Sequence, residues 1–362
     1  MKKTSRSKAL QKLRNQIDQI DVKSLNLLNK RAAIAKKIAQ VKSDSNNKNI
    51  FRPERESQII RDIIKLNKGP LTNSSLEIIY KEIISSCLSL ETNINVSYLG
   101  PTGSFSNLAL KKFFGSMVSP VCRDSIIDIF NDVISNTVNY GVVPIENSNQ
   151  GSISQTLELL IDKSIMICGE INLDVKHFLL SKLKNISSIS EIYAHEQTFL
   201  QCKDWIDKNL RNCKRIIVSS NSEAAKKARL KKNSAAIASE NCADEYKLHV
   251  LKKNIQDFSN NVTRFIIIGN DTVGISKDDK TSIVVSASNK PGSLYSLLQP
   301  LSKNSISMTK IESVPTKRKN WEYMFFLDID GHSEEPKIKK ALNSIKRRST
   351  FYKNLGSYPK SI

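Results

Sequence analysis

The chain has 362 residues, which exceeds one ordinary domain, so two or three hydrophobic cores are expected. Its net charge is +21, with 39% hydrophobic and 6% aromatic residues, and the excess lysines are spread along the sequence rather than gathered with aromatics. This distribution argues against a nucleic-acid partner, and the lack of a long apolar run argues against a spanning helix or a membrane partner.

The cysteines predict neither disulfides nor a metal site. They are scattered without CxxC pairing, and the four histidines are scattered as well. We therefore expect reduced thiols in a cytoplasmic protein without a signal peptide, no metal and no cofactor. The six cysteines are Cys87, Cys122, Cys168, Cys202, Cys213 and Cys242.

Residues 1–92 predict an all-helical domain, because glycine is almost absent and apolar residues recur at helical spacing. One long helix is expected over 10–41, followed by a loop over 43–49. Pro53 suits the first turn of a second helix that runs to about Leu66. Ser74 with Glu77 is a possible capping box for a third helix that ends near Glu91.

The basic residues of the first predicted helix have an informative spacing. Arg31 and Lys42 lie eleven residues apart, so they share one face with an axial separation of about 16 Å and can reach one small ligand. Arg14 precedes Arg31 by seventeen residues, about 25 Å along the axis. Unless the helix is broken, it reaches the same ligand only from a second copy of the chain. Taken singly, each of these residues is more often a solvated surface residue.

Six segments together resemble an all-helical chorismate mutase: Leu13-Arg14, Asp21, Lys30-Arg31, Val41-Lys42, RPERE at 52–56 and SSCLSLE at 85–91. The resemblance implies rearrangement of chorismate to prephenate in a homodimer that shares Arg14 across each site. Arg14 and Arg31 would hold the two substrate carboxylates. Lys42 and Glu91 would bracket the ether oxygen, and Glu56 would reach the ring hydroxyl. The remaining predicted site residues are Arg52, Arg55 and Cys87.

Three of these positions depart from the family pattern. Cys87 stands where some members have serine, Arg52 where some have aspartate, and Glu91 where others have glutamine. A carboxylate cannot donate a hydrogen bond, so Glu91 is expected to act when protonated. Mutase activity should then be better at mildly acidic pH, and Glu91→Gln should flatten the pH profile.

Residues 96–272 predict an α/β domain with mostly parallel sheets, because short β-rich runs alternate with helical stretches. Three loops rich in small and hydroxyl residues adjoin strand ends or helix starts, where anions bind. Capping and turns explain most such clusters singly, but three in one domain suit a substrate with two carboxylates. The loops are GPTGSFS (100–106), PIENSNQGSIS (144–154) and SSNSEAA (219–225).

Residues 96–269 resemble prephenate dehydratase through GVVPIENSNQGS, AHEQTFLQC at 194–202, AAIAS at 235–239 and NVTRF at 261–265. The family fold has two lobes, like a periplasmic binding protein. The resemblance makes Thr263 the general acid that assists departure of the ring hydroxyl. Arg264 either anchors a carboxylate or makes a structural ion pair. Secondary candidates are Ser106, Asn147, Ser148 and Gln201.

Other polar residues of this region have less specific interpretations. His177 and His195 are interpreted as structural, since a lone histidine is more often a hydrogen-bonded structural residue. Ala194 and Asn221 depart from the family, where serine and threonine are usual.

Residues 280–362, after a polar linker at 276–280, predict the order strand, helix, strand, strand, helix, strand, an α+β ferredoxin-like arrangement. Two stretches resemble the phenylalanine site of an ACT regulatory domain. They supply the predicted effector residues Gly292, Ser293, Leu294, Glu312 and Ser313. Ser293 replaces a usual alanine, and Val314 replaces a usual arginine, which predicts weakened feedback inhibition.

The sequence thus predicts a multidomain enzyme that converts chorismate, through prephenate, to phenylpyruvate under control by phenylalanine. Three alternatives remain open. The chain could be a non-enzymatic metabolite sensor, could retain one activity only, or could bind nucleic acid through its charge; the last is the weakest, and it predicts steeply salt-dependent affinity for any DNA.

Overall fold

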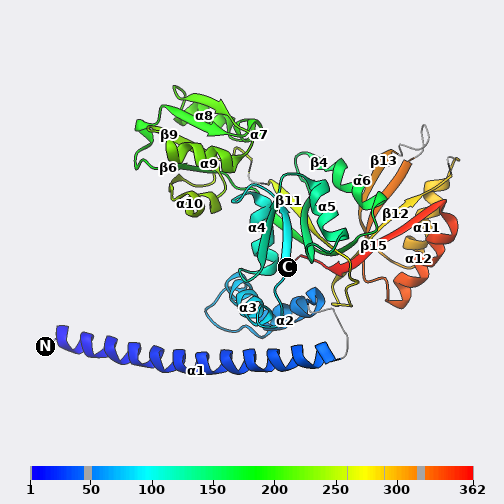
Figure 1. The fold of residues 1–362 in the computed structure, drawn as a ribbon, viewed down its shortest axis with the longest axis horizontal. Coiled ribbons are helices and arrows are strands. Elements are labelled where there is room, and N and C mark those ends of the chain that lie inside the picture. The colour runs from blue at the N-terminus through cyan, green and yellow to red at the C-terminus, as the bar shows by residue number, and fades with distance from the viewer. Residues whose placement is uncertain (1, 45–50, 259, 289, 316–322, 362) are drawn as a thin grey trace.

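The computed structural model describes residues 2–44, 51–258, 260–288, 290–315 and 323–361. It contains a helical region, a two-lobed α/β region and a C-terminal α+β domain, in chain order (Figure 1). Within the described ranges, no helix is both long enough and apolar enough to cross a membrane.

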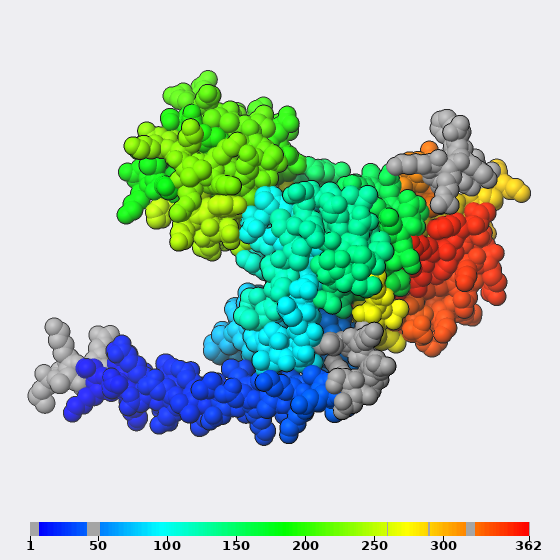
Figure 2. Space-filling model, viewed as in Figure 1, coloured from blue at the N-terminus to red at the C-terminus, as the bar shows by residue number. Residues whose placement is uncertain are grey.

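The helical region consists of α1 (Lys2–Asp44), α2 (Pro53–Leu66) and α3 (Asn73–Leu88). α2 and α3 pack against each other, and α1 contacts α3 through its C-terminal half only (Figure 1). The N-terminal half of α1 extends from the body as an arm (Figure 2). Its apolar stripe is exposed at Leu10, Leu13, Ile17 and Ile20.

Two details of the predicted helices are wrong. α1 continues through Ser43 and Asp44, which were expected in the loop; the rest of that predicted loop, 45–49, lies outside the described residues. The N-cap of α3 is Thr72, whose hydroxyl accepts from the Ser75 backbone N–H, so Ser74 and Glu77 form no capping box. A cap two residues earlier gives the helix a further half turn.

The first lobe is built on one sheet of order β2-β1-β3-β11-β5, with β4 paired to β3. β1 is parallel to β2 and β3, but β11 is antiparallel to β3 and β5. The prediction of a mostly parallel sheet is therefore wrong here, because β11 re-enters from the second lobe and runs against its neighbours. The elements are β1 (Asn95–Leu99), α4 (Phe105–Phe114), β2 (Ser119–Arg123), α5 (Ile126–Ile134), β3 (Tyr140–Asn147), β4 (Gly151–Ser152), α6 (Ser154–Asp162), β5 (Met166–Asp174) and β11 (Val262–Gly269).

The second lobe has a sheet of order β10-β6-β9-β7-β8, in which β7 is parallel to β8 and β9 while β6 is antiparallel to its neighbours. It touches the first lobe where the Tyr246 hydroxyl donates to the Thr102 carbonyl and the Ser239 hydroxyl donates to the Gly103 carbonyl. Its elements are β6 (Phe178–Ser181), β7 (Glu191–Ala194), α7 (Glu196–Gln201), α8 (Lys203–Asn209), β8 (Lys214–Ile217), α9 (Asn221–Leu230), β9 (Ser234–Ala238), α10 (Asn241–Tyr246) and β10 (His249–Lys252).

The C-terminal domain has the predicted strand and helix order, with an antiparallel sheet of order β13-β14-β12-β15. α11 and α12 cover its outer face (Figure 1), and its inner face shares one hydrophobic core with the first lobe, including Ile145, Ile266, Phe326 and Tyr358. The elements are β12 (Asp279–Ser286), α11 (Ser293–Lys303), β13 (Met308–Pro315), β14 (Tyr323–Asp330), α12 (Pro336–Arg348) and β15 (Phe351–Pro359).

Candidate functional site

A cavity of about 740 Å³ lies where α1, α2 and α3 meet. Leu27, Ile34, Ile59 and Ile84 contribute apolar walls. Six residues singled out from the sequence line the same cavity: Arg31 from α1, Arg52 at the N-cap of α2, Arg55 and Glu56 from α2, Cys87 from α3, and Glu91. Cationic and acidic groups inside an apolar wall suit a small anionic ligand with an apolar ring.

The two other predicted residues of this site belong to α1. Arg14 lies on the exposed N-terminal half of α1, away from the cavity lining. Lys42 belongs to α1, but its side chain lies outside the described residues.

The Glu56 carboxyl of this cavity is strongly perturbed by burial. Burial raises its pKa from 4.5 to about 7, although Lys81 and Arg31 oppose the shift through their positive charges. Burial in turn lowers the pKa of Lys81. Lys81 was missed by the sequence analysis, yet it lies one helical turn before buried Ser85, so the helical period places it on the inner face of α3.

A second cluster of predicted residues lies at the paired ends of β3 and β11, where Thr263 faces Asn147 in the ladder. The Asn147 side-chain Nδ2 donates to Thr263 Oγ1 and to Asn261 Oδ1, both at 2.8 Å. Asn147 Oδ1 accepts from the Asn149 backbone N–H, which fixes the orientation of the amide. Because the Thr263 oxygen accepts from Asn147, its own proton can be donated elsewhere.

Ser148 belongs to the same cluster. Its hydroxyl donates to the Asn260 carbonyl at 3.0 Å and accepts from the Val262 backbone N–H at 3.0 Å. Ser148 therefore ties the loop after β3 to the chain that enters β11, directly beside Thr263.

The other two small-residue loops face each other across a pocket of about 480 Å³ between the lobes. Thr102 comes from the first loop, and Ser219 and Ser220 come from the third. The N-terminus of α9 already holds a carboxylate there, because Glu223 accepts from the Ser219 backbone N–H and hydroxyl. These bonds, together with the one from the Lys227 ammonium, lower the Glu223 pKa to about 2. A substrate anion at this helix start would meet an occupied, negatively charged position.

Ser106 and Gln201 lie on helices of the first and second lobes. Ser106 is buried in α4. Gln201 Oε1 lies 2.7 Å from Nε2 of His177, and burial lowers the pKa of that histidine. His195 caps α7 through its ring nitrogen, so both histidines have structural contacts.

Arg264 follows Thr263 in β11 and therefore points to the opposite face of the sheet. Its guanidinium donates to Glu170 Oε2 at 2.8 Å, to Asp328 Oδ2 at 2.6 Å and to the Tyr358 hydroxyl at 3.0 Å. Of the two roles left open by the sequence, the geometry supports the structural ion pair.

The predicted effector residues lie on α11 and β13. Gly292 is the N-cap of α11 with φ +79°, a left-handed conformation that favours glycine. Ser293 Oγ lies 3.2 Å from Ser288 Oγ, and Leu294 packs against the core of the domain. Glu312 Oε2 accepts from the Ser152 hydroxyl of the first lobe at 2.9 Å, and Ser313 is the next residue of β13.

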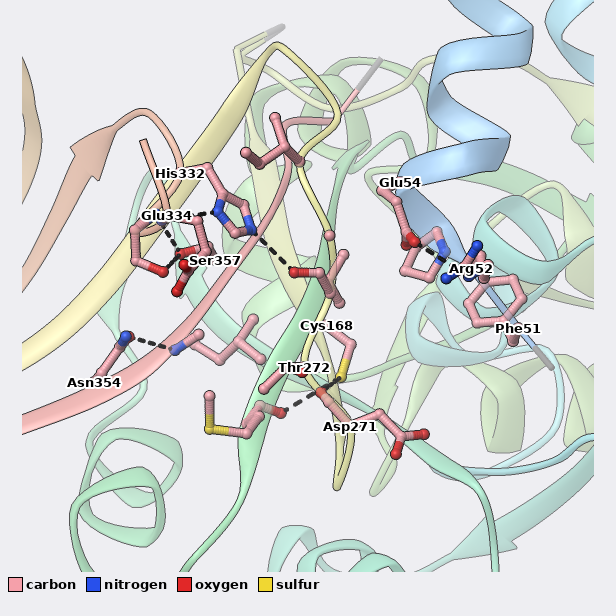
Figure 3. Close-up of a pocket in the computed structure, with 18 of the residues that line it drawn as sticks. Phe51, Arg52, Glu54, Cys168, Asp271, Thr272, His332, Glu334, Asn354 and Ser357 are labelled. Atoms are coloured by element: carbon pink, nitrogen blue, oxygen red, sulfur yellow. Dashed lines mark hydrogen bonds and ion pairs between the residues drawn. The ribbon is translucent and has the colours of Figure 1, made fainter. Parts of the chain in front are cut away.

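A further pocket, of about 580 Å³, lies at the seam of all three parts of the chain (Figure 3). His332 is fixed there, with Nδ1 accepting from the Glu334 backbone N–H and Nε2 donating to the Val273 carbonyl at 2.9 Å. The Cys168 thiol donates to the Asp271 carbonyl, and burial raises its pKa to about 12. Arg52 and Glu54 line the opposite side (Figure 3). Of the predicted site residues, this pocket includes only Arg52.

Among the described residues, no group of three or more His, Cys, Asp or Glu side chains is placed to hold a metal ion.

Comparison with known proteins finds a separate family for each of the three regions of the chain, in the order helical, α/β and C-terminal. Three family models match: chorismate mutase type II over residues 13–92, prephenate dehydratase over 96–273 and the ACT domain over 281–347. The bifunctional chorismate mutase/prephenate dehydratase of Pseudomonas aeruginosa is 42% identical over 358 residues, 98% of each chain. The one of Aquifex aeolicus is 41% identical over 357 residues, again 98% of each. The solved prephenate dehydratase of Arthrobacter aurescens in complex with L-Phe aligns with a TM-score of 0.67 and 28% identity, covering 74% of this chain and 90% of that one.

Proposed function

This chain belongs to the bifunctional chorismate mutase/prephenate dehydratase family, and from that premise we propose how its residues divide between two catalytic sites and one effector site. The enzyme rearranges chorismate to prephenate and then removes water and carbon dioxide from prephenate to give phenylpyruvate. Phenylalanine is the effector of its ACT domain. The proposed domain boundaries are 1–92, 96–272 and 280–362, and the proposed location is the cytoplasm.

The cavity between α1, α2 and α3 is the proposed mutase site. The observation that carries this assignment is the convergence of Arg31, Arg55, Glu56 and Glu91 on one partly apolar cavity. Arg31 holds one carboxylate of chorismate, Lys42 and Glu91 bracket the ether oxygen, and Glu56 reaches the ring hydroxyl. The rearrangement is intramolecular, so the residues need only hold the reactive conformer and stabilise charge at the breaking C–O bond.

Arg14 of a second copy of the chain is proposed to hold the other carboxylate. Within one chain Arg14 is exposed and separated from the cavity, while the apolar stripe beside it has no covering in the described fold. A homodimer in which two α1 helices pair would bury both stripes and deliver each Arg14 to the opposite cavity.

Mixed dimers test the shared site. Arg14→Ala and Arg31→Ala chains are co-expressed with different tags, and the doubly tagged heterodimer is purified. One site then has neither arginine and the other has both, so mutase activity is expected at about half the wild-type value per dimer. Each variant homodimer should be inactive, and dehydratase activity should be unchanged throughout. An inactive heterodimer would show that both arginines come from one chain.

Thr263 is proposed as the general acid of the dehydratase site. Its hydroxyl proton passes to the departing ring hydroxyl, which leaves as water, while the ring carboxylate leaves as carbon dioxide and its electron pair makes the ring aromatic. Asn147 supports the Thr263 oxygen through the 2.8 Å hydrogen bond. A threonine is a weak acid in water, so this preorganised contact is required. Ser106, Ser148 and Gln201 are proposed to help bind or enclose prephenate.

A single incubation tests the whole assignment. Purified protein is given chorismate, and prephenate and phenylpyruvate are followed separately, with and without phenylalanine. Phenylpyruvate formation that phenylalanine suppresses is expected. Prephenate alone would confine activity to the helical region, and no turnover would favour a metabolite-binding protein.

A further inference from the structure

The two strands that carry the proposed dehydration centre also carry a charged pair on their other face. In the β3–β11 ladder Thr263 is paired with Asn147, and the next pair is Arg264 with Glu146. Successive residues of a strand point to opposite faces. Asn147 and Thr263 therefore point to one face of the sheet, while Glu146 and Arg264 point to the other face, toward the C-terminal domain.

Each member of the Glu146–Arg264 pair is held by the C-terminal domain. Arg264 donates to Asp328 of β14 at 2.6 Å and to Tyr358 of β15 at 3.0 Å. Glu146 forms an ion pair with Lys310 of β13 at 2.8 Å. Arg264 and Glu146 themselves lie 3.9 Å apart.

The network is electrically balanced and buried except at Glu146, whose side chain is 37% exposed. Only 8% of the Lys310 side chain and 10% of the Arg264 side chain are exposed, and Asp328 is fully buried. Lys280 pairs with Glu170, which also accepts from Arg264, so three cations meet three anions. Buried charges of this kind hold fixed positions, because separating one from its partner leaves an uncompensated charge.

β13 also contacts β4, the strand that follows the loop beside Thr263, through a second set of hydrogen bonds. Lys310 and Glu312 are two residues apart and reach the same hydroxyl: Lys310 Nζ donates to Ser152 Oγ at 2.9 Å, and Ser152 Oγ donates to Glu312 Oε2 at 2.9 Å. Ser152 lies on β4 and is paired with Glu146, and Gly151 is paired with Asn147. β13 thus holds both strands of the hairpin that carries Asn147 and Ser148.

We propose that Lys310, through Glu146 and Ser152, is a positioning residue for dehydration that ties β13 of the ACT domain to the Asn147–Thr263 pair. This inference rests on Thr263 as the proposed acid. Any shift of β13 on effector binding moves Glu146 and Ser152 directly, and Asn147 is their neighbour in the hairpin. A displaced Asn147 amide no longer supports the Thr263 oxygen, so dehydration slows without any contact between effector and substrate.

A set of charge-matched variants tests the proposal. Lys310→Met removes the Lys310 contacts to Glu146 and Ser152 and leaves Glu146 with the 3.9 Å contact to Arg264, whereas Lys310→Met/Glu146→Gln removes the same contacts and keeps the network neutral. Lys310→Arg restores a cation, and the exposed Lys339→Met is the matched control. Dehydratase kcat and KM, the phenylalanine inhibition midpoint and mutase activity are measured on each full-length protein.

Both tie-less variants should lose on the order of tenfold in dehydratase kcat with a smaller change in KM, because the loss falls on the chemical step. Their phenylalanine inhibition should weaken, Lys310→Arg should recover most of kcat, and Lys339→Met should match wild type. Mutase activity, which belongs to another region of the same chain, reports intact folding. Wild-type kcat and inhibition in the neutral double variant would overturn the proposal, since a merely structural ion pair is then sufficient.

Two further variants separate the possible failures. If Lys310→Met also loses mutase activity, Ser152→Ala and the neutral double variant decide together, because neither leaves a buried charge without its partner; wild-type dehydratase kcat and inhibition in both would then overturn the proposal. Dehydratase activity that survives Thr263→Ala would refute the proposed acid itself. Loss of activity in Thr263→Ala together with unaffected tie-less variants would refute only the role of Lys310.

Discussion

Neighbouring residues of one strand have opposite tasks in this enzyme. Thr263 faces Asn147 at a hydrogen-bond distance of 2.8 Å, while Arg264 is turned into a buried ion-pair network. The sequence motif contains both residues side by side, and only strand geometry separates them. The substitution of either residue should therefore have a different signature.

Replacing residues of the Asn147–Thr263 pair should abolish dehydration selectively. Thr263→Ala is expected to remove detectable dehydratase activity. The isosteric Asn147→Asp places an acceptor opposite the Thr263 oxygen, so the threonine proton turns toward it, and kcat should fall on the order of 10²-fold. Phenylpyruvate formation from prephenate measures both effects. Mutase activity on chorismate is the control, and an equal loss of both activities would indicate misfolding instead.

The carboxyl of Glu56 predicts a pH dependence of stability. Burial raises its pKa from 4.5 to about 7, so between these values the folded chain holds a proton that the unfolded chain has released. The free energy of unfolding therefore decreases as pH rises through this window. Glu56→Gln cannot titrate, and its urea midpoint, followed by circular dichroism at pH 5 and pH 8, should change less than that of wild type. An equal change in both proteins would contradict the shift.

At the scale of elements, patterns local to one helix were predictable from sequence and contacts between distant segments were not. Helical periodicity predicted α1, and Pro53 marked the start of α2. The local sequence did not distinguish Thr72 from Ser74 as the N-cap of α3, since both residues offer a hydroxyl at a helix start. The antiparallel entry of β11 depends on the path through the second lobe, which no local pattern records.

The candidate sites divide in the same way. The resemblance brought together six residues of the mutase cavity, and the structure places them along one lining. The partners of Arg264 were not predictable, because Glu170, Asp328 and Tyr358 are each more than sixty residues from it in sequence. Lys81 was overlooked because one lysine on an amphipathic helix resembles a solvated one.

The contact between β15 and β5 depends on a glycine. Gly356 has φ +129°, and a Cβ there would lie 2.4 Å from the Ile167 carbonyl oxygen, whereas a Cβ on Gly292, with φ +79°, would meet nothing within 4 Å. Gly292→Ala should cost about 1 kcal/mol from backbone strain alone. Gly356→Ala should cost clearly more, because a backbone atom cannot move aside. Urea denaturation of both variants measures the difference, and equal losses would contradict the close approach.

Across the whole molecule, the ACT domain and the first lobe are one packing unit rather than two linked domains. Their shared core contains Val314 of β13, which is 6% exposed, together with Ile145 and Ile266. The residue that departs from the family pattern in the effector motif is therefore part of the domain contact in this chain.

Restoring the usual arginine at this position should not restore tight feedback. Val314→Arg would place a guanidinium in the shared apolar core, which is expected to lower stability by several kcal/mol and weaken the link to the dehydratase. Thermal unfolding and phenylalanine titration by calorimetry measure the two effects. Wild-type stability with tighter phenylalanine binding would contradict the prediction, and undetectable binding by the parent chain would make the ACT domain a structural remnant.

Because the N-terminal half of α1 is free in one chain, the two activities should depend differently on protein concentration. On the proposed dimer, mutase turnover requires two chains to meet, whereas Thr263 and Asn147 come from one chain. Dilution should then abolish mutase activity before it lowers dehydratase activity. A cell that makes little of this protein would form little prephenate from chorismate while still consuming any prephenate supplied to it, so expression level itself would set the balance between the two reactions.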